Sequence, residues 1–363
     1  MSLLGEGIQK VDTGDMLVYK SGPQRMIGVK ELNVEALRAG VIGLGIGKRH
    51  AMVLAEMEEA ELVAIADFKE ELAHELGEQL DCTFYEEGSE LLANEELDFV
   101  CICTPPAVHL PLTEEAAKQG VNVFCEKPMA GRLEDCDGMI GACEEAGVQL
   151  MVGQKKRFQP AFTFVKQMIN EDFGVLRWAT LRYACGRVPM DWFWEEGNGG
   201  GPLVENSVHA VDTLRYLMGE VERVYAEGGN LFNEDRAPQL DTAAVSLRFE
   251  GGGIAAIGCG QAYEWGFARE NSYFAHENAL VEISGSFDNP EHLRYILRSE
   301  PDTMIEVDRP EKNLFNLELR HFCECIRSGE TPLVSGEEAR KSVAVCLAIK
   351  ESSRTGKPIP LSE

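Results

Sequence analysis

The sequence predicts an α/β protein with an N-terminal doubly wound parallel sheet and a C-terminal α+β domain that holds an open, mostly antiparallel sheet. Two observations predict this fold. Between residues 37 and 153, apolar runs alternate with helical patterns, which is typical of parallel βαβ units. After about residue 155, strand-like runs follow one another without intervening helices, as in antiparallel sheets.

Length and charge narrow the class of protein. A chain of 363 residues is long for one core and suits two domains. With 44% hydrophobic and 26% charged residues, the composition is that of a globular protein. A formal net charge of −27 repels phosphate backbones and anionic lipid, so neither nucleic-acid nor membrane partners are expected.

Cysteine usage and the N-terminus indicate a cytoplasmic protein. The N-terminus has no basic start followed by an apolar segment, so no secretory signal is expected. Eleven cysteines are scattered through apolar segments, without a C-x-x-C pair. They are interpreted as reduced, mostly buried thiols. Neither cysteine nor histidine shows ligand spacing, so no metal site is expected.

The elements of the N-terminal half follow in order. Residues 1–37 show no clear period and are interpreted as an N-terminal extension, followed by a dinucleotide-binding domain at 38–155 and a substrate-binding and oligomerisation domain at 156–363. Strands are expected at 37–45, 61–67, 98–104, 121–128 and 148–153, and helices at 48–57, 69–80, 109–120 and 133–147.

The elements of the C-terminal half are mainly strands. A long strand is expected at 177–187, a hairpin at 241–261, further strands at 278–287 and 292–300, and amphipathic helices at 202–218, 313–329 and 336–356. An open sheet leaves one face free for packing, so a homodimer or homotetramer is expected.

The stretch G-L-G-I-G at 43–47 predicts a cofactor turn. It follows an apolar strand and opens a helix, which is the context of a dinucleotide fingerprint (Rossmann fold). Gly43 permits the tight turn, and Gly45 with Ile46 lets the backbone approach a pyrophosphate. Gly47 packs the helix on the strand if the turn is one residue shorter than usual. The alternative is an ordinary strand–helix turn whose glycines serve packing.

Asp67 predicts the choice of cofactor. It ends the second strand, 20 residues after Gly47, where a carboxylate accepts hydrogen bonds from the adenosine ribose. A 2′-phosphate would meet like charge there, so NAD is favoured over NADP.

Residues at two strand ends suggest a ligand edge. Glu126 and Lys127 follow the apolar run VNVFC (121–125), and Thr104, Pro105 and His109 sit at the edge of the preceding strand. Ligands of open α/β sheets bind at this carboxyl edge. Partial desolvation is expected to lower the pKa of Lys127, which suits proton transfer.

The helix at 202–218 carries a polar stripe. At about 100° per residue, Glu205, His209, Asp212 and Tyr216 share one narrow face, opposite the apolar positions. Such a face suits the lining of a polar cleft, with Asp212 holding the imidazole of His209 in one tautomer. The alternative is a capped surface helix with side-chain pairs along it.

Four motifs in order resemble the Gfo/Idh/MocA oxidoreductases. They are DFVCICTPPAVH (98–109), FCEKPMA (124–130), QKKRFQPAF (154–162) and GGGPLVENSVHAVD (199–212). The resemblance runs from about residue 38 to the C-terminus. It implies a Rossmann domain followed by an open-sheet domain, and oxidation or reduction of a hydroxyl or carbonyl on a sugar, cyclitol or related molecule with NAD(P).

The resemblance also implies roles for single residues. Lys127 would contact the nicotinamide ribose and the substrate oxygen, and Glu126, Thr104, Pro105 and His109 would lie beside the cofactor. The proton-relay role carries over to His209. Glu205 stands where the family usually has Asp, so it is expected to orient His209 or bind a substrate hydroxyl.

Arg157 and Trp192 are further substrate-binding candidates. They join the candidates named above: Lys127, Glu205, His209 and Asp212. Arg157 follows the last strand of the parallel sheet and is expected to face the cleft. Trp192 precedes the glycine-rich segment and either stacks on a sugar ring or packs in an interface.

The leading hypothesis is therefore an NAD-dependent dehydrogenase of a sugar, cyclitol or related polyol, with Lys127, His209 and Glu205 as the catalytic residues. The alternatives are an NAD-dependent, redox-assisted glycoside hydrolase and a non-catalytic NAD-binding regulator.

Overall fold

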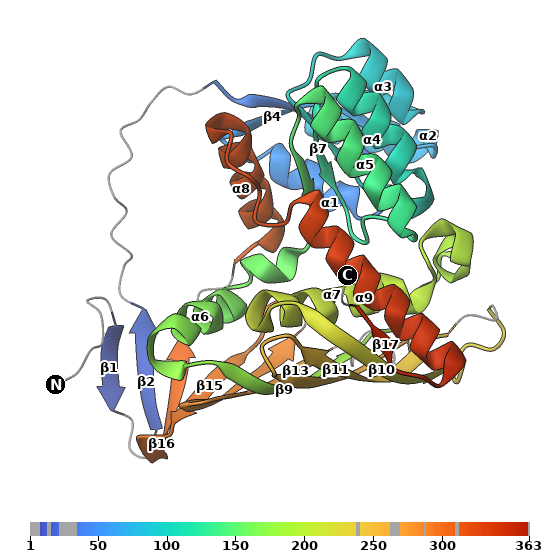
Figure 1. The fold of residues 1–363 in the computed structure, drawn as a ribbon. Helices are drawn as coiled ribbons and strands as arrows, with labels where there is room; N and C mark the ends of the chain where they lie inside the picture. Colours follow the sequence, from blue (N-terminus) through green and yellow to red (C-terminus); the bar gives the residue numbers. More distant parts are fainter. Residues whose placement is uncertain are drawn as a thin grey trace.

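Two sheets organise the chain in a computed structural model (Figure 1). The structure describes residues 8–12, 16–21, 35–236, 240–261, 269–286, 288–308 and 312–361. A six-stranded parallel sheet and its helices form one half of the molecule, and an eleven-stranded mixed sheet forms the other. The predicted α/β fold class is confirmed.

The parallel sheet has the strand order β5-β4-β3-β6-β7-β8. Its strands are β3 (Leu37–Ile42), β4 (Ala60–Ala66), β5 (Thr83–Tyr85), β6 (Phe99–Ile102), β7 (Asn122–Cys125) and β8 (Leu150–Val152). The order reverses between β3 and β6, so a crevice opens at the carboxyl ends of these two strands.

Helices cover both faces of the parallel sheet. The helices α1 (Gly47–Leu54) and α2 (Glu70–Leu80) contribute to the core on one face. The other face is covered by α3 (Gly88–Asn94), α4 (His109–Lys118) and α5 (Leu133–Ala146). The short β5 and α3 were not expected from the sequence.

The second sheet is mostly antiparallel, in the order β1-β2-β16-β15-β14-β13-β9-β12-β11-β10-β17. Its strands are β1 (Ile8–Asp12), β2 (Met16–Ser21), β9 (Leu176–Ala184), β10 (Val221–Gly229), β11 (Thr242–Phe249), β12 (Ile254–Gly260), β13 (Arg269–His276), β14 (Ala279–Ser286), β15 (His292–Leu297), β16 (Glu300–Asp308) and β17 (Ile359–Pro360). Two strands of the N-terminal extension thus extend this sheet beside β16.

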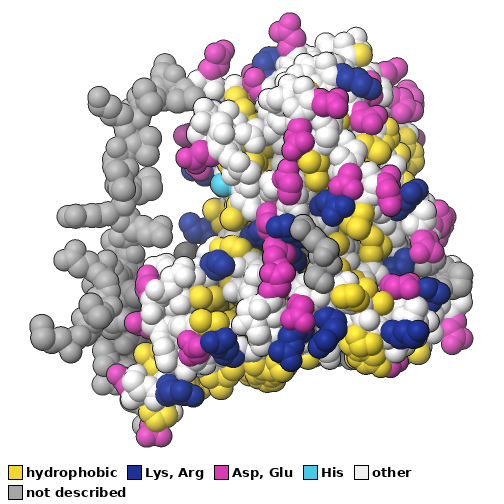
Figure 2. Space-filling view, in the orientation of Figure 1, with side chains coloured by type: hydrophobic (Ala, Val, Ile, Leu, Met, Phe, Trp, Pro, Cys, Tyr) yellow, Lys and Arg dark blue, Asp and Glu magenta, His cyan; other side chains and the backbone are white. Residues whose placement is uncertain are grey.

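One face of the large sheet carries helices, and none of the described helices covers the other, which is called the open face below. The helices α6 (Pro160–Met168), α7 (Pro202–Met218) and α9 (Gly336–Thr355) lie over one face (Figure 1). Burial alternates along the strands, so every second side chain points to the open face. Hydrophobic side chains gather there, along the lower edge of Figure 2. Exposed examples are Trp178, Tyr225, Ile254, Tyr273 and Leu280.

The C-terminal segment connects the two halves. Helix α8 (Leu314–Ser328) returns to the parallel sheet, where the Phe322 ring lies edge-on to that of Phe99 at 5.6 Å. Helix α9 places Ala339 and Val343 in the core of the parallel sheet and Ile349 in that of the large sheet. The predicted domain boundaries stay a proposal, because segments after residue 156 complete both cores.

Short helical turns connect the main elements. They are η1 (Pro106–Val108), η2 (Lys155–Phe158), η3 (Ile169–Phe173), η4 (Asp191–Trp194) and η5 (Glu196–Asn198). Within the described part of the chain, no helix has the length and apolar character needed to cross a membrane.

Candidate active site

The glycine turn between β3 and α1 brings backbone segments into close contact. Gly43 has a φ of +88°, and a Cβ there would lie 2.8 Å from the carbonyl carbon of Cys103. A Cβ on Gly47 would lie 2.9 Å from the Cβ of Cys103 and 3.0 Å from Cγ1 of Val41. Both positions therefore exclude larger residues. Gly47 packs the helix on the strand as expected for the shortened turn.

The same turn leaves room for an anionic group. A Cβ on Gly45 would meet no described atom within 4 Å, so the backbone is open there. Helix α1 begins next to it, after Ile46, and no side chain of the described residues caps it. Its N-terminal N–H groups and positive dipole end are thus available to a phosphate. This cradle fits the pyrophosphate of a dinucleotide.

Asp67 closes the far end of the turn. Its Oδ2 accepts a hydrogen bond from the N–H of Leu44 at 2.6 Å, and its Oδ1 accepts one from the N–H of Lys69 at 2.9 Å. Each carboxylate oxygen has a second lone pair that a ribose hydroxyl fits. Asp67 thus lies where the sequence predicts the adenosine ribose, and its contact with the ribose stays a prediction.

Lys127 reaches from the edge of the parallel sheet to helix α7. Its Nζ lies 3.1 Å from Oε2 of Glu205 and donates to the backbone oxygen of Glu205 at 3.2 Å. The side chain of Lys127 is 20% exposed and that of Glu205 is 4% exposed. Residues from the two halves of the chain therefore meet at this edge. The pair joins two of the three predicted catalytic residues.

The charge state of this pair differs from the sequence-based expectation. Burial alone lowers the pKa of Lys127, but the carboxylates of Glu205 and Glu126 outweigh it and raise the pKa. The expected lowered pKa is therefore wrong, because the sequence does not show the partner. Burial raises the pKa of Glu205, and the Lys127 ammonium group opposes this rise. Lys127 is an ammonium group at neutral pH.

His209 lies one turn after Glu205 on the same helix. Its ring stacks on that of Tyr183 from β9, with centroids 5.6 Å apart and an interplanar angle of 28°. Burial, with smaller contributions from Lys127 and other lysines, lowers the pKa of His209 well below its usual value. The imidazole is therefore neutral at pH 7 and able to accept a proton.

Several polar atoms on residues that follow β6 and β8, and on α7, are buried without partners among the described residues. Such atoms normally find hydrogen bonds, so they are candidates for contacts with a polar ligand. They are Oγ1 of Thr104, Nε2 and Oε1 of Gln154, Oε1 of Glu205 and Nδ2 of Asn206. Gln154 and Asn206 were not singled out from the sequence. Gln154 lies two residues after β8, so its place near the carboxyl edge was a usable signal.

Arg157 and Asp212 pair with each other instead of joining the Lys127 cluster. Nε and Nη2 of Arg157 lie 2.9 and 2.8 Å from the two oxygens of Asp212, and both side chains are buried. Ser342 of α9 also donates to Asp212, at 3.0 Å. The expectation that Asp212 orients His209 is not supported, because both of its oxygens are engaged elsewhere. The pair fastens η2 to α7 and α9.

His109 is buried and bonded to backbone. Its Nδ1 lies 3.0 Å from the carbonyl oxygen of Met129, and its Nε2 lies 2.9 Å from that of Thr104. Burial lowers its pKa, and the neutral ring donates one hydrogen bond. His109 thereby ties the segment that holds Thr104 and Pro105 to the segment after Lys127. Direct contact between its side chain and the cofactor stays a prediction.

Trp192 packs with its neighbours. Its ring centroid lies 6.0 Å from that of Phe193, and the side chain borders a small cluster with Val188 and Trp194. Packing is the alternative that this geometry favours. A stacking role on a sugar ring stays a prediction.

Dinucleotide-binding oxidoreductases are the class of protein that this fold and this sheet edge define. The chain belongs to the Gfo/Idh/MocA family: a model described as "Oxidoreductase family, NAD-binding Rossmann fold" matches residues 37–154, and one described as "Oxidoreductase family, C-terminal alpha/beta domain" matches residues 166–361. It is an oxidoreductase, and its cofactor is NAD.

Relatives cover nearly the whole chain. It is 32% identical to the myo-inositol 2-dehydrogenase of Thermotoga maritima over 346 residues, which are 90% of this chain and 99% of the relative. Its structure resembles the aldose-aldose oxidoreductase of Caulobacter crescentus in complex with glycerol, with a TM-score of 0.82, 27% identity and coverage of 90% and 100%. It also resembles the WlbA dehydrogenase of Bordetella pertussis in complex with NADH and UDP-GlcNAcA, with a TM-score of 0.78 and 27% identity. The match covers 91% of this chain and 100% of that structure.

Proposed function

We propose that the protein is an NAD-dependent dehydrogenase that moves a hydride between nicotinamide and a hydroxyl or carbonyl carbon of a cyclitol, sugar or related polyol. One observation carries this proposal: Lys127 contacts Glu205 at the carboxyl edge of the parallel sheet, and its charge also acts on the neutral imidazole of His209, one turn further along α7. The 32% identity to a myo-inositol 2-dehydrogenase supports a polyol substrate.

The three residues take complementary roles. When bound, NAD supplies the hydride acceptor or donor at its nicotinamide ring. The ammonium group of Lys127 donates a hydrogen bond to the substrate oxygen and stabilises negative charge on it. His209 accepts the hydroxyl proton, because its imidazole is neutral. Glu205 holds Lys127 in place through the contact at 3.1 Å.

The polar atoms without partners favour a polyhydroxylated substrate. A site built to hydrogen-bond hydroxyl groups discriminates strongly against analogues that lack them, since its buried polar atoms would stay unpaired. Gln154, Asn206 and the second oxygen of Glu205 offer both donors and acceptors for such a ring of hydroxyls.

A substrate panel tests this function. Cyclitols, aldoses, sugar acids and nucleotide sugars are each mixed with the protein and NAD or NADP, and NADH fluorescence is followed. We expect NADH to accumulate with a cyclitol or sugar, and NAD to be preferred. Release of a sugar without net NADH would instead indicate redox-assisted glycoside hydrolysis. NAD binding without turnover of any compound would indicate a regulator.

We infer a homodimer or homotetramer that forms through the open face of the large sheet. Trp178 and Leu280 are 42% and 47% exposed on this face. The double variant Trp178→Glu, Leu280→Glu is expected to halve the mass in solution or reduce it further, because unpaired charges are costly to bury in an interface. Light scattering measures this, with Gln119→Glu on α4 as the control. A monomeric parent protein would contradict the inference.

The cellular setting proposed is the cytoplasm. All eleven cysteines are free, and ten of them are buried. Unpaired thiols in this number suit a reducing compartment.

A further inference from the structure

Three buried titratable side chains meet beside the cofactor edge, and the proposed mechanism leaves this contact unexplained. They are His50 on α1, Glu126 directly after β7, and Glu318 on α8. One nitrogen or oxygen atom from each lies within 4.8 Å of those from the others. Helix α8 thus brings a carboxyl group from the C-terminal part of the chain to Glu126, next to Lys127.

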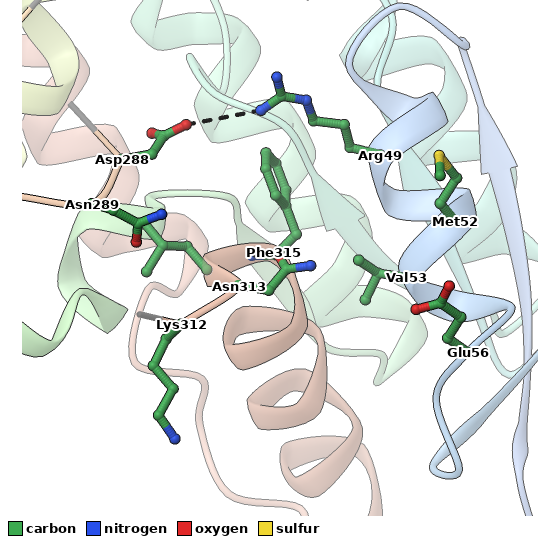
Figure 3. Close-up of a pocket in the computed structure, with 10 residues that line it drawn as sticks. Arg49, Met52, Val53, Glu56, Asp288, Asn289, Lys312, Asn313 and Phe315 are labelled. Atoms are coloured by element: carbon green, nitrogen blue, oxygen red, sulfur yellow. Dashed lines mark hydrogen bonds and ion pairs between the residues drawn. The ribbon is translucent and has the colours of Figure 1, made fainter. Parts of the chain in front are cut away.

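Two aromatic rings pack against the imidazole of this cluster. The ring of Phe315 lies edge-on to that of His50 at 5.0 Å, and the ring of Phe124 lies 5.1 Å from it. Phe315 also lines a cavity of about 630 Å³ between α1 and α8, at whose rim Arg49 faces Asp288 (Figure 3). The cavity ends at Phe315; His50 and Glu318 are fully buried, and the side chain of Glu126 is 8% exposed.

The two carboxyl groups differ in their partners. Glu126 uses both oxygens: Oε1 lies 2.8 Å from Nε2 of His50, and Oε2 accepts from the N–H of Lys127 at 3.0 Å. Neither oxygen of Glu318 has a hydrogen-bond partner among the described residues. Two ionised carboxylates this close in an apolar setting are very costly, so one of them carries a proton.

Glu318 is the one that keeps its proton. Burial raises its pKa well above the usual value, and the charge of Glu126 raises it further. The pKa of Glu126 is lowered, because His50 and Lys127 outweigh the effect of its burial. The other titratable groups that act on Glu318 or feel its charge lie on neighbouring elements: Lys155, Asp288, Cys101 and Cys103.

We propose that Glu318 is a positioning residue of the NAD site, which stays a neutral carboxylic acid and shares its proton with the Glu126 carboxylate. The shared proton fixes Glu126 and His50 against α8. This rests on the proposed role of Glu126 beside the cofactor. It requires the two carboxyl groups, whose nearest oxygens lie within 4.8 Å, to approach to hydrogen-bond distance.

A divalent cation is the competing occupant, because one histidine and two carboxylates also suit such an ion. The direct contact of 2.8 Å between His50 and Glu126 disfavours it, since a cation would have to replace this bond. The N–H of Lys127 already engages the other oxygen of Glu126. The geometry therefore favours the proton.

The test compares Glu318→Gln and Glu318→Leu in the full chain. Gln is neutral and can donate the same hydrogen bond, whereas Leu cannot. We expect the Kd for NAD, measured by titration without substrate, to stay within about threefold of the parent value for Gln. For Leu we expect it to rise about tenfold, the loss typical of one hydrogen bond to a charged group.

Two measurements that need no substrate separate this proposal from the proposed function. The parent protein should lose stability relative to Glu318→Gln as pH rises above the ordinary glutamate value of 4.5, because the folded state resists ionisation of Glu318. Infrared difference spectra should show a protonated carboxyl band that Glu318→Gln lacks. Glu324→Gln, exposed on the same helix, is the control and should show neither effect.

Three results would overturn the proposal. They are the absence of that band, a Glu318→Gln variant that loses stability relative to the parent as pH rises, and stoichiometric metal in the purified protein that Glu318→Gln removes. If Glu318→Leu does not fold, the pH and infrared measurements on Glu318→Gln still test the proposal. If no dehydrogenase activity is found but both pH and infrared effects appear, the proposed function fails and the shared proton stands.

Discussion

Replacing Lys127 by Met is expected to reduce turnover by about 10²–10⁴-fold, while NAD still binds. Met keeps an unbranched apolar side chain that reaches to Cε, and it lacks the ammonium group. The substrate oxygen then loses the donor that stabilises its negative charge. Binding of the dinucleotide is expected to depend mainly on the glycine turn and Asp67, which this change does not touch.

Single-turnover kinetics and NAD titration measure the two effects separately. The control is Lys118→Met, an exposed lysine at the end of α4. Loss of the partner also leaves the Glu205 carboxyl group buried without its cation, so thermal unfolding must show that the variant is folded. Normal turnover in a folded Lys127→Met variant would contradict the catalytic role.

The order of the elements could be predicted because the parallel sheet is built from long, regular units. Each apolar strand and each amphipathic helix has a hydrophobic pattern that can be recognised within a short window of sequence. Strand β5 (Thr83–Tyr85) was missed because it has only three residues, of which none is fully buried. The position of α8 on the parallel sheet depends on contacts such as Phe322 with Phe99, which are far apart in the sequence.

The candidate site could be predicted only in part. Lys127 and Glu205 were found from motifs, but their contact joins residues 78 positions apart, and the pKa of Lys127 follows from that contact. Asp212 shares the angular stripe of Glu205 but lies about 10 Å further along the helix axis. The angular position of a residue on a helix predicts the direction of its side chain, but not which residue it meets there. The partner of Asp212 is Arg157.

Replacing Arg157 by Met is expected to lower the free energy of unfolding by about 3–5 kcal/mol. This substitution leaves the carboxylate of Asp212 fully buried without the guanidinium group that pairs with both of its oxygens. Ser342 would still donate one hydrogen bond, at 3.0 Å, which is too little to replace an ion pair. Urea unfolding of the parent and the variant measures the difference.

The double variant Arg157→Met, Asp212→Leu tests whether the pair is structural. Removing both charges takes away the unpaired carboxylate, so the double variant should recover most of the stability lost in Arg157→Met. If Arg157 instead binds substrate, Arg157→Met should unfold normally and raise KM. Adding Asp212→Leu would then not restore the KM, because the missing contact would be to the substrate. The bidentate geometry inside the protein favours the structural role, since a guanidinium group engaged with Asp212 has little left to offer a ligand.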